Sequence, residues 1–261
     1  MELGLQGKMA VITGGSMGIG LAIAHGLAAE GVDVALCARS GERVRAAAEE
    51  VKKAHGVRAI GVSCDVTRPG QIAAFARRVE EEFGGCDILI NNAGVGAMAR
   101  IEDSTQETLR RVFEVNFFAL FELTQLALPH LKKGAEPMVV NLSSIVGLRG
   151  VPHYSVYGSA KFAVAGLSES MRAEFVRYGI DVLLVCPGTT QTEFFDVLCQ
   201  DTSQPKLPVH RSVTSEYVAA RIVRAMKQGK HKIIPYFPAV LLDKLNRLCP
   251  RFVDWIMAKY A

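Results

Sequence analysis

The sequence of 261 residues lacks several patterns that would point to other classes of protein. Its six cysteines form no Cys-x-x-Cys pair and do not cluster with histidine, so we expect a reducing compartment and no metal site. No segment reaches the roughly 18 uninterrupted apolar residues of a transmembrane helix, and the first apolar run is structural rather than signal-like. The formal charge of +4 is mild and dispersed, which does not call for nucleic acid. These absences predict a cytoplasmic protein.

A linker is also missing, because no stretch rich in proline, glycine, serine or like charges divides the chain and no repeat is visible. With 49% hydrophobic residues, the chain can bury a sizeable core. Short apolar runs alternate with helical patterns, which is typical of a parallel sheet. We therefore predict an α/β fold: a single-domain, Rossmann-like, doubly wound parallel sheet with helices on both faces. The domain is expected over residues 1–235, with an apolar C-terminal extension, 236–261, packed on it.

The first apolar run, Lys8 to Thr13, leads into a glycine-rich turn and then a helical pattern. This order of strand, turn and helix is the context that a dinucleotide site requires. Glycines let the backbone approach a pyrophosphate, and a helix N-terminus offers free N–H groups and a favourable dipole. The turn residues predicted to bind the cofactor are Gly14, Ser16, Met17, Gly18, Ile19 and Gly20.

The second predicted strand, 32–38, ends in Ala38-Arg39-Ser40. An acidic residue at this place would hold the ribose 2′-hydroxyl of NAD, but the position is apolar here. Arg39 can instead form a bidentate hydrogen bond with a 2′-phosphate and compensate its charge. The sequence therefore predicts NADP(H), with NAD(H) as the less favoured alternative.

Two serines and a Tyr-x-x-x-Lys pair lie between 141 and 161. Ser143 and Ser144 follow a buried strand, at the sheet edge where ligands bind in open α/β folds. Tyr157 and Lys161 are four residues apart and share one face of a predicted helix that begins near Ser155. A tyrosine pKa of roughly 10 is too high for efficient proton donation, and a neighbouring ammonium is expected to lower it.

These features together resemble the short-chain dehydrogenase/reductase family, whose turn reads Thr-Gly-x-x-x-Gly-x-Gly. Ser144 lies thirteen residues before Tyr157, a spacing that selects it over Ser143. The resemblance implies that Ser144 orients the carbonyl, Tyr157 donates the proton, and Lys161 holds the nicotinamide ribose and lowers the Tyr157 pKa. It also implies that Asn116 holds a water in a proton relay. The alternative for Asn116 is a core amide with its hydrogen bonds satisfied.

Further cofactor contacts follow from the same resemblance. An Asp-Val pair after the third strand contacts the adenine in the family, and an Asn-Asn-Ala-Gly segment passes beside the cofactor. A Pro-Gly segment and a following threonine bind the nicotinamide side. Family members that use NADP often add a basic residue before the middle glycine of the turn, where this chain has Met17. The residues carried over are Asp65, Val66, Asn92, Ala93, Gly94, Pro187, Gly188 and Thr192.

Residues 193–213 lose periodicity, and the family has its mobile substrate lid at this place. The apolar residues here, Phe194, Phe195, Val197 and Leu198, indicate an apolar ligand. The extension 236–261 mixes large apolar residues with basic ones. It is expected to pack on the domain or on a second subunit of a homodimer or homotetramer. The alternatives are a cap over a lipid-like substrate and a peripheral contact with a membrane surface.

The expected activity is an NADP(H)-dependent oxidoreductase that interconverts a ketone and a secondary alcohol by hydride transfer. The expected substrate is hydrophobic, such as a steroid, retinoid or lipid. A 3-oxoacyl-carrier-protein reductase is the alternative within the enzyme class. A non-catalytic NADP(H)-binding sensor is the alternative outside it, and the intact set of Ser144, Tyr157 and Lys161 favours an enzyme.

Overall fold

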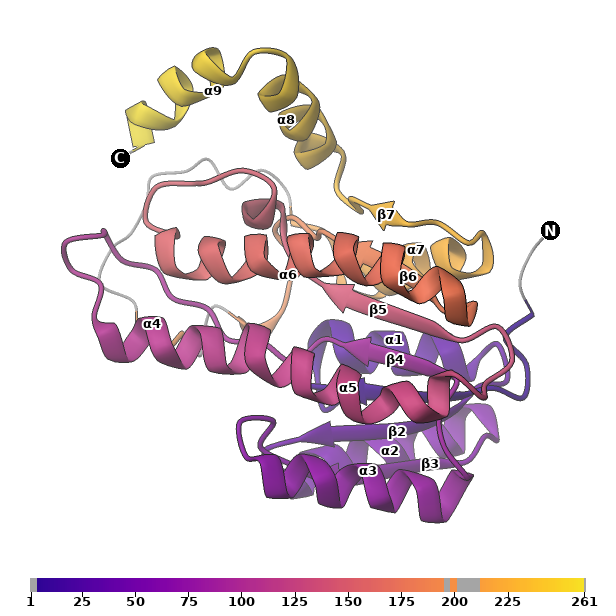
Figure 1. Ribbon diagram of the computed structural model, residues 1–261. Helices are drawn as coiled ribbons and strands as arrows, with labels where there is room; N and C mark the ends of the chain where they lie inside the picture. The colour runs from indigo at the N-terminus through magenta and orange to yellow at the C-terminus, as the bar shows by residue number, and fades with distance from the viewer. Residues whose placement is uncertain (1–3, 195–197, 201–211, 261) are drawn as a thin grey trace.

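The computed structural model describes residues 4–194, 198–200 and 212–260. Within them lies one seven-stranded sheet in the order β3-β2-β1-β4-β5-β6-β7, and each pair of neighbouring strands is parallel. Helices cover both faces of this sheet (Figure 1). The predicted fold class, a doubly wound parallel α/β sheet, is confirmed.

The elements follow the predicted alternation, with ends that shift by a few residues. The strands are β1 (Met9–Thr13), β2 (Asp33–Ala38), β3 (Ala59–Ser63), β4 (Ile88–Asn91), β5 (Met138–Leu142), β6 (Asp181–Val185) and β7 (Lys232–Ile233). The helices are α1 (Gly18–Ala28), α2 (Gly41–His55), α3 (Pro69–Phe83), α4 (Gln106–Phe113), α5 (Ala119–Leu131), α6 (Ser155–Phe175), α7 (Ser215–Lys227), α8 (Phe237–Leu248) and α9 (Pro250–Met257).

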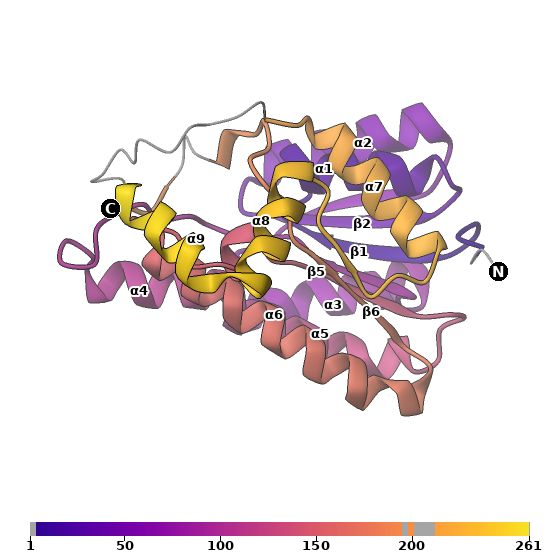
Figure 2. The same ribbon diagram turned by 90° about the horizontal axis from the view of Figure 1, so that it is seen from above.

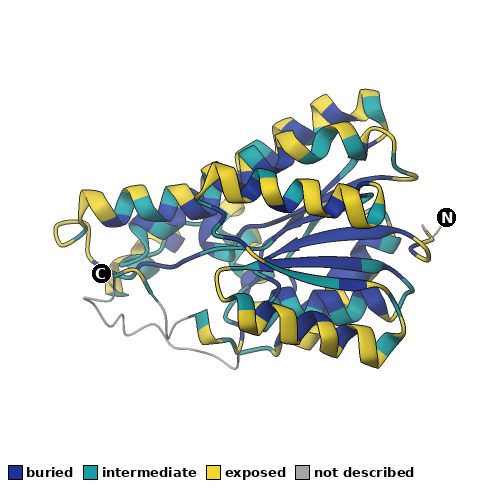
Figure 3. Ribbon diagram, turned by 90° about the horizontal axis from the view of Figure 1, so that it is seen from below, coloured by how far each residue is buried: buried dark blue, intermediate teal, exposed yellow. Residues whose placement is uncertain are grey.

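The sheet separates two apolar cores. Ala10 and Ile12 of β1 face the core shared with α1, α2 and α7. Val11, the residue between them, faces the core shared with α3 to α6. Because both faces are covered, the central strands are continuous apolar runs rather than alternating ones. Figure 3 shows the buried sheet between helices whose outer faces are exposed.

Strand order reverses beside β1, which pairs with β2 on one side and β4 on the other. The crossover after β1 leads to β2 and the crossover after β4 leads to β5, on opposite sides of this switch point, so a crevice opens at the carboxyl ends of β1 and β4. The glycine turn after Thr13 and the segment after Asn91 therefore lie at the same edge of the sheet.

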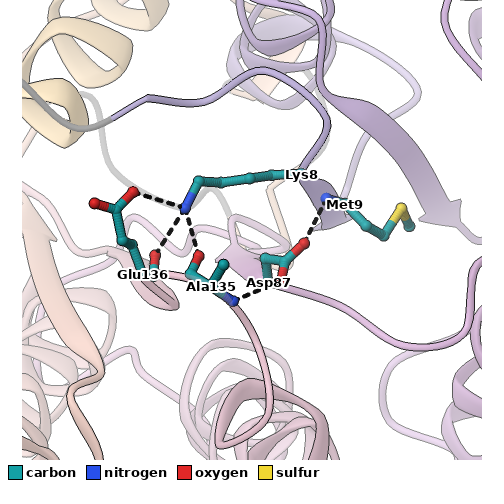
Figure 4. Close-up of polar contacts among 5 residues, drawn as sticks. All are labelled: Lys8, Met9, Asp87, Ala135 and Glu136. Carbon is teal, nitrogen blue, oxygen red and sulfur yellow. Dashed lines mark hydrogen bonds and ion pairs between the residues drawn. The ribbon is translucent and has the colours of Figure 1, made fainter.

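The opposite edge of the sheet is fixed by a polar cluster around Lys8 and Asp87 (Figure 4). The Lys8 ammonium donates to the carbonyl of Ala135 and lies 3.2 Å from a Glu136 carboxylate oxygen. Asp87 accepts a 2.9 Å hydrogen bond from the Met9 amide. These contacts tie the starts of β1, β4 and β5 together, away from the crevice.

A π-helical turn, Glu114–Phe118, lies between α4 and α5 within one long helical segment. Such a turn inserts a residue into the helix and often marks a functional site. Over the described residues, the helix 106–131 is the one segment with the length and mean hydropathy, 1.2, of a membrane span. Core helices pass the same test, and Leu120, Leu123 and Leu131 of this helix pack into the core.

The C-terminal extension forms α8 and α9, which lie over the carboxyl end of the sheet near α6 (Figure 2). A salt bridge of 2.6 Å between Arg149 and Asp254 ties α9 to the domain. Ala239 of α8 and Val253 of α9 are buried. The extension therefore covers the region above the crevice.

Candidate active site

A cavity of about 870 Å³ opens at the carboxyl ends of the strands. It collects residues from the glycine turn and from the ends of the central strands, together with α6 and α8. Gly20 and Asn116 are the predicted site residues that do not line it. Those that do are Gly14, Ser16, Met17, Gly18, Ile19, Arg39, Asp65, Val66, Asn92, Ala93, Gly94, Ser144, Tyr157, Lys161, Pro187, Gly188 and Thr192.

The glycine turn needs its glycines for two different reasons. Gly14 and Gly18 have φ angles of 64° and 55°, in the left-handed region that glycine adopts without strain. A Cβ atom on Gly20 would lie 2.3 Å from the Gly14 carbonyl oxygen, so Gly20 permits close packing of α1 on the turn. Met17 gives α1 no side-chain cap, and the N–H groups at this end stay available for an anion.

Thr13 and Asn92 join the turn to the segment after β4. The Thr13 hydroxyl accepts hydrogen bonds from the amides of Asn92 and Ala93, at 3.0 and 2.9 Å. The Asn92 side chain donates to the carbonyls of Thr13 and Gly14, at 2.8 and 3.1 Å. Asn92 thus has the structural role of satisfying backbone groups at strand ends.

Ser144, Tyr157 and Lys161 come together inside the cavity. The Ser144 hydroxyl is hydrogen-bonded to Tyr157, and the Lys161 Nζ lies 5.7 Å from the centre of the Tyr157 ring. Lys161 is held there by a 2.9 Å hydrogen bond to the Leu142 carbonyl at the end of β5. Ser143 differs from its neighbour, because its hydroxyl donates to the Lys161 carbonyl at 2.8 Å. The two serines therefore have different contacts: the Ser144 hydroxyl meets Tyr157, and the Ser143 hydroxyl meets the backbone of α6.

The electrostatics of this cluster differ from the expectation. Burial raises the pKa of Tyr157 well above its usual value, although the hydrogen bond with Ser144 acts to lower it. Burial also lowers the pKa of Lys161 to about 8. The prediction that the lysine brings the tyrosine pKa down was wrong for this state of the protein. The reason is that desolvation dominates in an enclosed site, whereas sequence spacing reports only proximity.

Asn116 lies in the π-helical turn and is only 1% exposed. Its side-chain amide donates to the carbonyls of Val95 and Val112, at 2.8 and 2.9 Å, and its oxygen accepts from the Val95 amide. The side chain therefore has the partners of a satisfied core amide. It approaches Lys161 across Gly94, where a Cβ atom would lie 2.6 Å from the Asn116 oxygen and 3.5 Å from the Lys161 Nζ. A role in a water relay stays a prediction.

One end of the cavity is basic. Arg39 and Arg43 line it beside Ser40, at the start of α2. Burial acts to raise the pKa of Asp65, but hydrogen bonds from Thr67 and the nearby charges of Arg111 and Arg39 outweigh it, and the pKa is lowered. Sequence reasoning missed Arg43 and Arg111; the available signal for the first was that Arg43 lies in the first turn of α2, four residues after Arg39.

The other end is apolar and lies under α8 and α9. The Phe194 ring is 5.5 Å from the Tyr157 ring, centre to centre. Leu242 and Met257 line the cavity from the extension, and Tyr236 packs directly on Gly188, where no Cβ would fit. Phe195 and Val197 of the predicted lid lie outside the described residues. Leu242, Met257 and Tyr236 could not be assigned to the cavity from the sequence, because the extension has no motif.

The described residues contain no group of three or more His, Cys, Asp or Glu side chains that could hold a metal ion. The cysteines are free thiols, four of them buried.

Comparison with known proteins agrees with this geometry. The chain matches the family model described as short chain dehydrogenase over residues 8–202. It is 33% identical to the ketoacyl reductase HetN of Nostoc sp., covering 88% of this chain and 79% of that protein. It is also 33% identical to a D-beta-hydroxybutyrate dehydrogenase of Rhizobium meliloti, covering 83% and 82% of the two chains.

Solved structures of short-chain dehydrogenases are also similar to this chain. A short-chain dehydrogenase/reductase of Burkholderia phymatum in complex with NAD aligns with a TM-score of 0.87 and 25% identity over 96% of each chain. A short-chain dehydrogenase of Sphingobium yanoikuyae in complex with NADPH aligns with a TM-score of 0.80 and 29% identity over 95% of each chain. Fold and cavity define an oxidoreductase of the doubly wound α/β class. Within that class, the chain belongs to the short-chain dehydrogenase family.

Proposed function

We propose that this protein is an NADP(H)-dependent oxidoreductase that interconverts a hydrophobic ketone and its secondary alcohol. The observation that carries the proposal is the cluster of Ser144, Tyr157 and Lys161 in one cavity with the glycine turn. A dinucleotide on the turn would place its nicotinamide beside this cluster. The bound cofactor supplies the hydride, and the protein supplies the proton and the positioning.

In the reducing direction, Ser144 and Tyr157 both donate hydrogen bonds to the substrate oxygen, which fixes it and stabilises developing negative charge. The Tyr157 proton then passes to that oxygen. The phenol is protonated at neutral pH and so enters the reaction as an acid, but burial raises its pKa and makes the proton transfer harder. The Lys161 ammonium, close to the ring face, stabilises the phenolate that forms.

The basic end of the cavity supports NADP(H) as the cofactor. Arg39 and Arg43 both line it, and Arg43 supplies a second cation although Met17 occupies the expected position for one. Arg43 also lies 3.7 Å from the carboxylate of Glu193, on the segment that leads into the lid. Solved relatives carry either NADPH or NAD, so the preference rests on these arginines.

Arg39→Asp should weaken NADPH binding by roughly 10- to 100-fold, because a hydrogen bond to a charged group contributes about 1.5–3 kcal/mol. The same change adds an acceptor for a ribose 2′-hydroxyl, so NADH binding should hold steady or improve. Titration with each cofactor, followed by fluorescence, measures the ratio of the NADPH and NADH dissociation constants. Lys52→Asp, an exposed charge reversal at the far end of α2, is the matched control. An unchanged NADPH/NADH preference would show that Arg39 does not contact the phosphate.

The apolar end of the cavity supports a hydrophobic substrate. Burying hydrocarbon stabilises binding by roughly 0.8 kcal/mol per CH₂, and Phe194, Leu242 and Met257 offer such a surface. We expect bulky apolar ketones to have higher kcat/KM than short polar ones. Leu242→Gln with Met257→Gln should reduce that difference at least tenfold and leave small ketones nearly unaffected.

Deletion of residues 236–261 also tests whether the extension contributes to the preference for bulky apolar ketones, by a larger change than the two substitutions. It should narrow the substrate preference if the extension forms part of the pocket. If the deletion lowers stability but leaves the ranking of ketones by kcat/KM unchanged, the extension has a purely structural role. Equal turnover of small polar and large apolar ketones by the intact protein would contradict the hydrophobic-substrate proposal.

Reduction of a 3-oxoacyl thioester is the second candidate, and similarity to the ketoacyl reductase HetN favours it. A panel that includes acetoacetyl thioesters, assayed by loss of NADPH absorbance, separates the two substrates. Absence of turnover with every ketone, together with tight NADPH binding, would favour a non-catalytic sensor.

Assembly into a homodimer or homotetramer and a cytoplasmic location stay predictions. An apolar surface for assembly is offered by three exposed residues: Phe118 of the π-helical turn, Phe121 of α5 and Phe162 of α6.

A further inference from the structure

We propose that the outer face of α8 and α9 binds the surface of an anionic lipid bilayer. The outer face is defined by the apolar residues Phe237, Leu241, Leu248, Phe252 and Trp255 and by the cations between them. This surface goes beyond the proposed reaction, and membrane binding does not depend on which ketone is reduced.

The exposed apolar residues of α8 form a continuous stripe. Phe237, Leu241, Lys244 and Leu248 recur at spacings of four, three and four residues, so they lie on one side of the helix. Phe237 and Leu248 are 79% and 80% exposed. Large apolar side chains grouped in this way on a monomer surface mark an interaction site, whereas scattered ones do not.

α9 continues the pattern with aromatic residues. Phe252 and Trp255 are exposed, and their rings stack at 5.9 Å with an interplanar angle of 22°. The Lys259 Nζ lies 3.5 Å from the centre of the Trp255 ring. An aromatic ring with a cation beside it is suited to the lipid interface, where the ring enters the headgroup region and the ammonium meets phosphate.

The two stripes point away from the protein body because the opposite sides of the same helices face the cavity. Ala239 and Leu242 of α8 and Met257 of α9 line that cavity. Both helices thus have apolar residues on the inner and the outer side. An apolar inner side is explained by the cavity, whereas the apolar outer side has no such explanation within the described residues.

The acidic and basic side chains of the extension differ in their surroundings. Its two carboxylates are held in ion pairs: Asp254 with Arg149 of the domain at 2.6 Å, and Asp243, largely buried, with Arg247 at 3.3 Å. Lys244 and Arg251 are exposed beside the apolar stripes. The outer face therefore presents apolar groups with cations, the combination that binds anionic lipid.

The same charge pattern disfavours a second copy as the occupant. In a twofold contact the same patch meets itself, so Lys244, Arg251 and Lys259 would be brought toward their counterparts. Like charges brought together at an interface are destabilising. An anionic bilayer has the complementary charge, and its acyl region accepts the apolar stripes.

A bilayer at this position would bring lipid-dissolved apolar ketones close to the cavity, since the inner sides of α8 and α9 line it. The reaction site would then draw its substrate from the lipid phase rather than from dilute solution. This consequence rests on the proposed function, whereas the binding itself does not.

Trp255 provides the measurement, because it is the only tryptophan in the chain. The full-length protein is mixed with vesicles of phosphatidylcholine alone and with vesicles that contain about a third phosphatidylglycerol. We expect sedimentation with the anionic vesicles, a blue shift of Trp255 emission, and quenching by brominated acyl chains. Binding should weaken in about 1 M salt, where the screening length is about 3 Å.

Two sets of variants locate the surface. Leu241→Asp with Leu248→Asp should lower vesicle affinity at least tenfold. Lys244→Gln, Arg251→Gln and Lys259→Gln should each cost about fivefold, as expected for one cation near an anionic surface. The controls are Val176→Asp, an exposed apolar site elsewhere, and the single changes Lys52→Gln, Lys53→Gln and Arg77→Gln, each of which removes one positive charge from α2 or α3. NADPH titration and circular dichroism verify that each variant is folded.

The proposal is supported if the outer-face variants lose binding and quenching while the controls keep both. It is overturned if the folded protein binds neither vesicle type, or if outer-face and control variants bind alike. A blue shift that depends on protein concentration without vesicles would show that a second copy covers the surface, which also overturns it. Vesicle binding by a protein with no ketone reduction would leave this inference standing and refute the proposed function instead.

Discussion

Tyr157→Phe is expected to lower kcat for ketone reduction by about 10²–10⁴-fold, the usual contribution of a general acid. Phenylalanine keeps the ring packed against Phe194, at 5.5 Å in the native protein, and removes only the hydroxyl. The substrate oxygen then has no proton donor within reach, since Ser144 can orient it but holds its proton too tightly to give it up. NADPH affinity should stay within a few-fold of the native value.

The measurement is loss of NADPH absorbance at saturating ketone, with the dissociation constant of NADPH determined separately. Tyr217→Phe, an exposed tyrosine on α7, is the matched control and should keep full activity. A Tyr157→Phe protein that keeps more than about a hundredth of the native rate would contradict the general-acid role. Loss of cofactor binding together with rate would show instead that the hydroxyl is needed to build the site.

The sheet could be predicted because each strand is encoded by the residues of its own segment. Each central strand is a short apolar run bounded by turn residues, and buried parallel strands need no more specific signal than this. The glycine turn after Thr13 also follows from local chemistry, since a positive φ at Gly14 and Gly18 restricts those positions. The π-helical turn at Glu114–Phe118 was missed because helical periodicity continues through it on both sides.

Site residues could be predicted where the spacing along the sequence determines their relative positions. They could not be predicted where tertiary packing determines those positions. Tyr157 and Lys161 share a helix face by their spacing, and Ser144 lies two residues after the end of β5. Leu242 and Met257 reach the cavity only because α8 and α9 fold back over the sheet, which no local pattern encodes. The Tyr157 pKa was mispredicted for the same reason, since burial is a property of the whole site.

Lys161 should make stability depend on pH in a way that a methionine at the same position abolishes. Burial lowers the pKa of Lys161 from the usual 10.5 to about 8, because the folded protein surrounds the ammonium with little solvent. Below pH 8 the lysine is protonated in both states, and the full cost of burying its charge is present. Between about pH 8 and 10.5 the unfolded chain keeps the proton while the folded protein releases it.

The unfolded state therefore binds more protons in that window, and the free energy of unfolding rises with pH through it. The fall in pKa corresponds to about 3 kcal/mol at 1.36 kcal/mol per unit. We expect the native protein to gain about that much between pH 8 and 10.5 relative to Lys161→Met, which cannot titrate. Urea unfolding at several pH values measures the difference, and taking the difference at each pH removes the contributions of groups common to both proteins.

The same substitution should reduce turnover at least 100-fold, because the phenolate formed at Tyr157 loses its neighbouring cation. It also removes the hydrogen bond to the Leu142 carbonyl, which positions the head of Lys161 beneath the catalytic ring. Lys52→Met, an exposed change on α2, should leave both activity and the pH profile unaltered. Parallel stability curves for the native and Lys161→Met proteins would show that the ammonium is solvated rather than buried. A steeper native curve together with lost turnover would establish that the protein accepts an unfavourable buried charge because the reaction requires it.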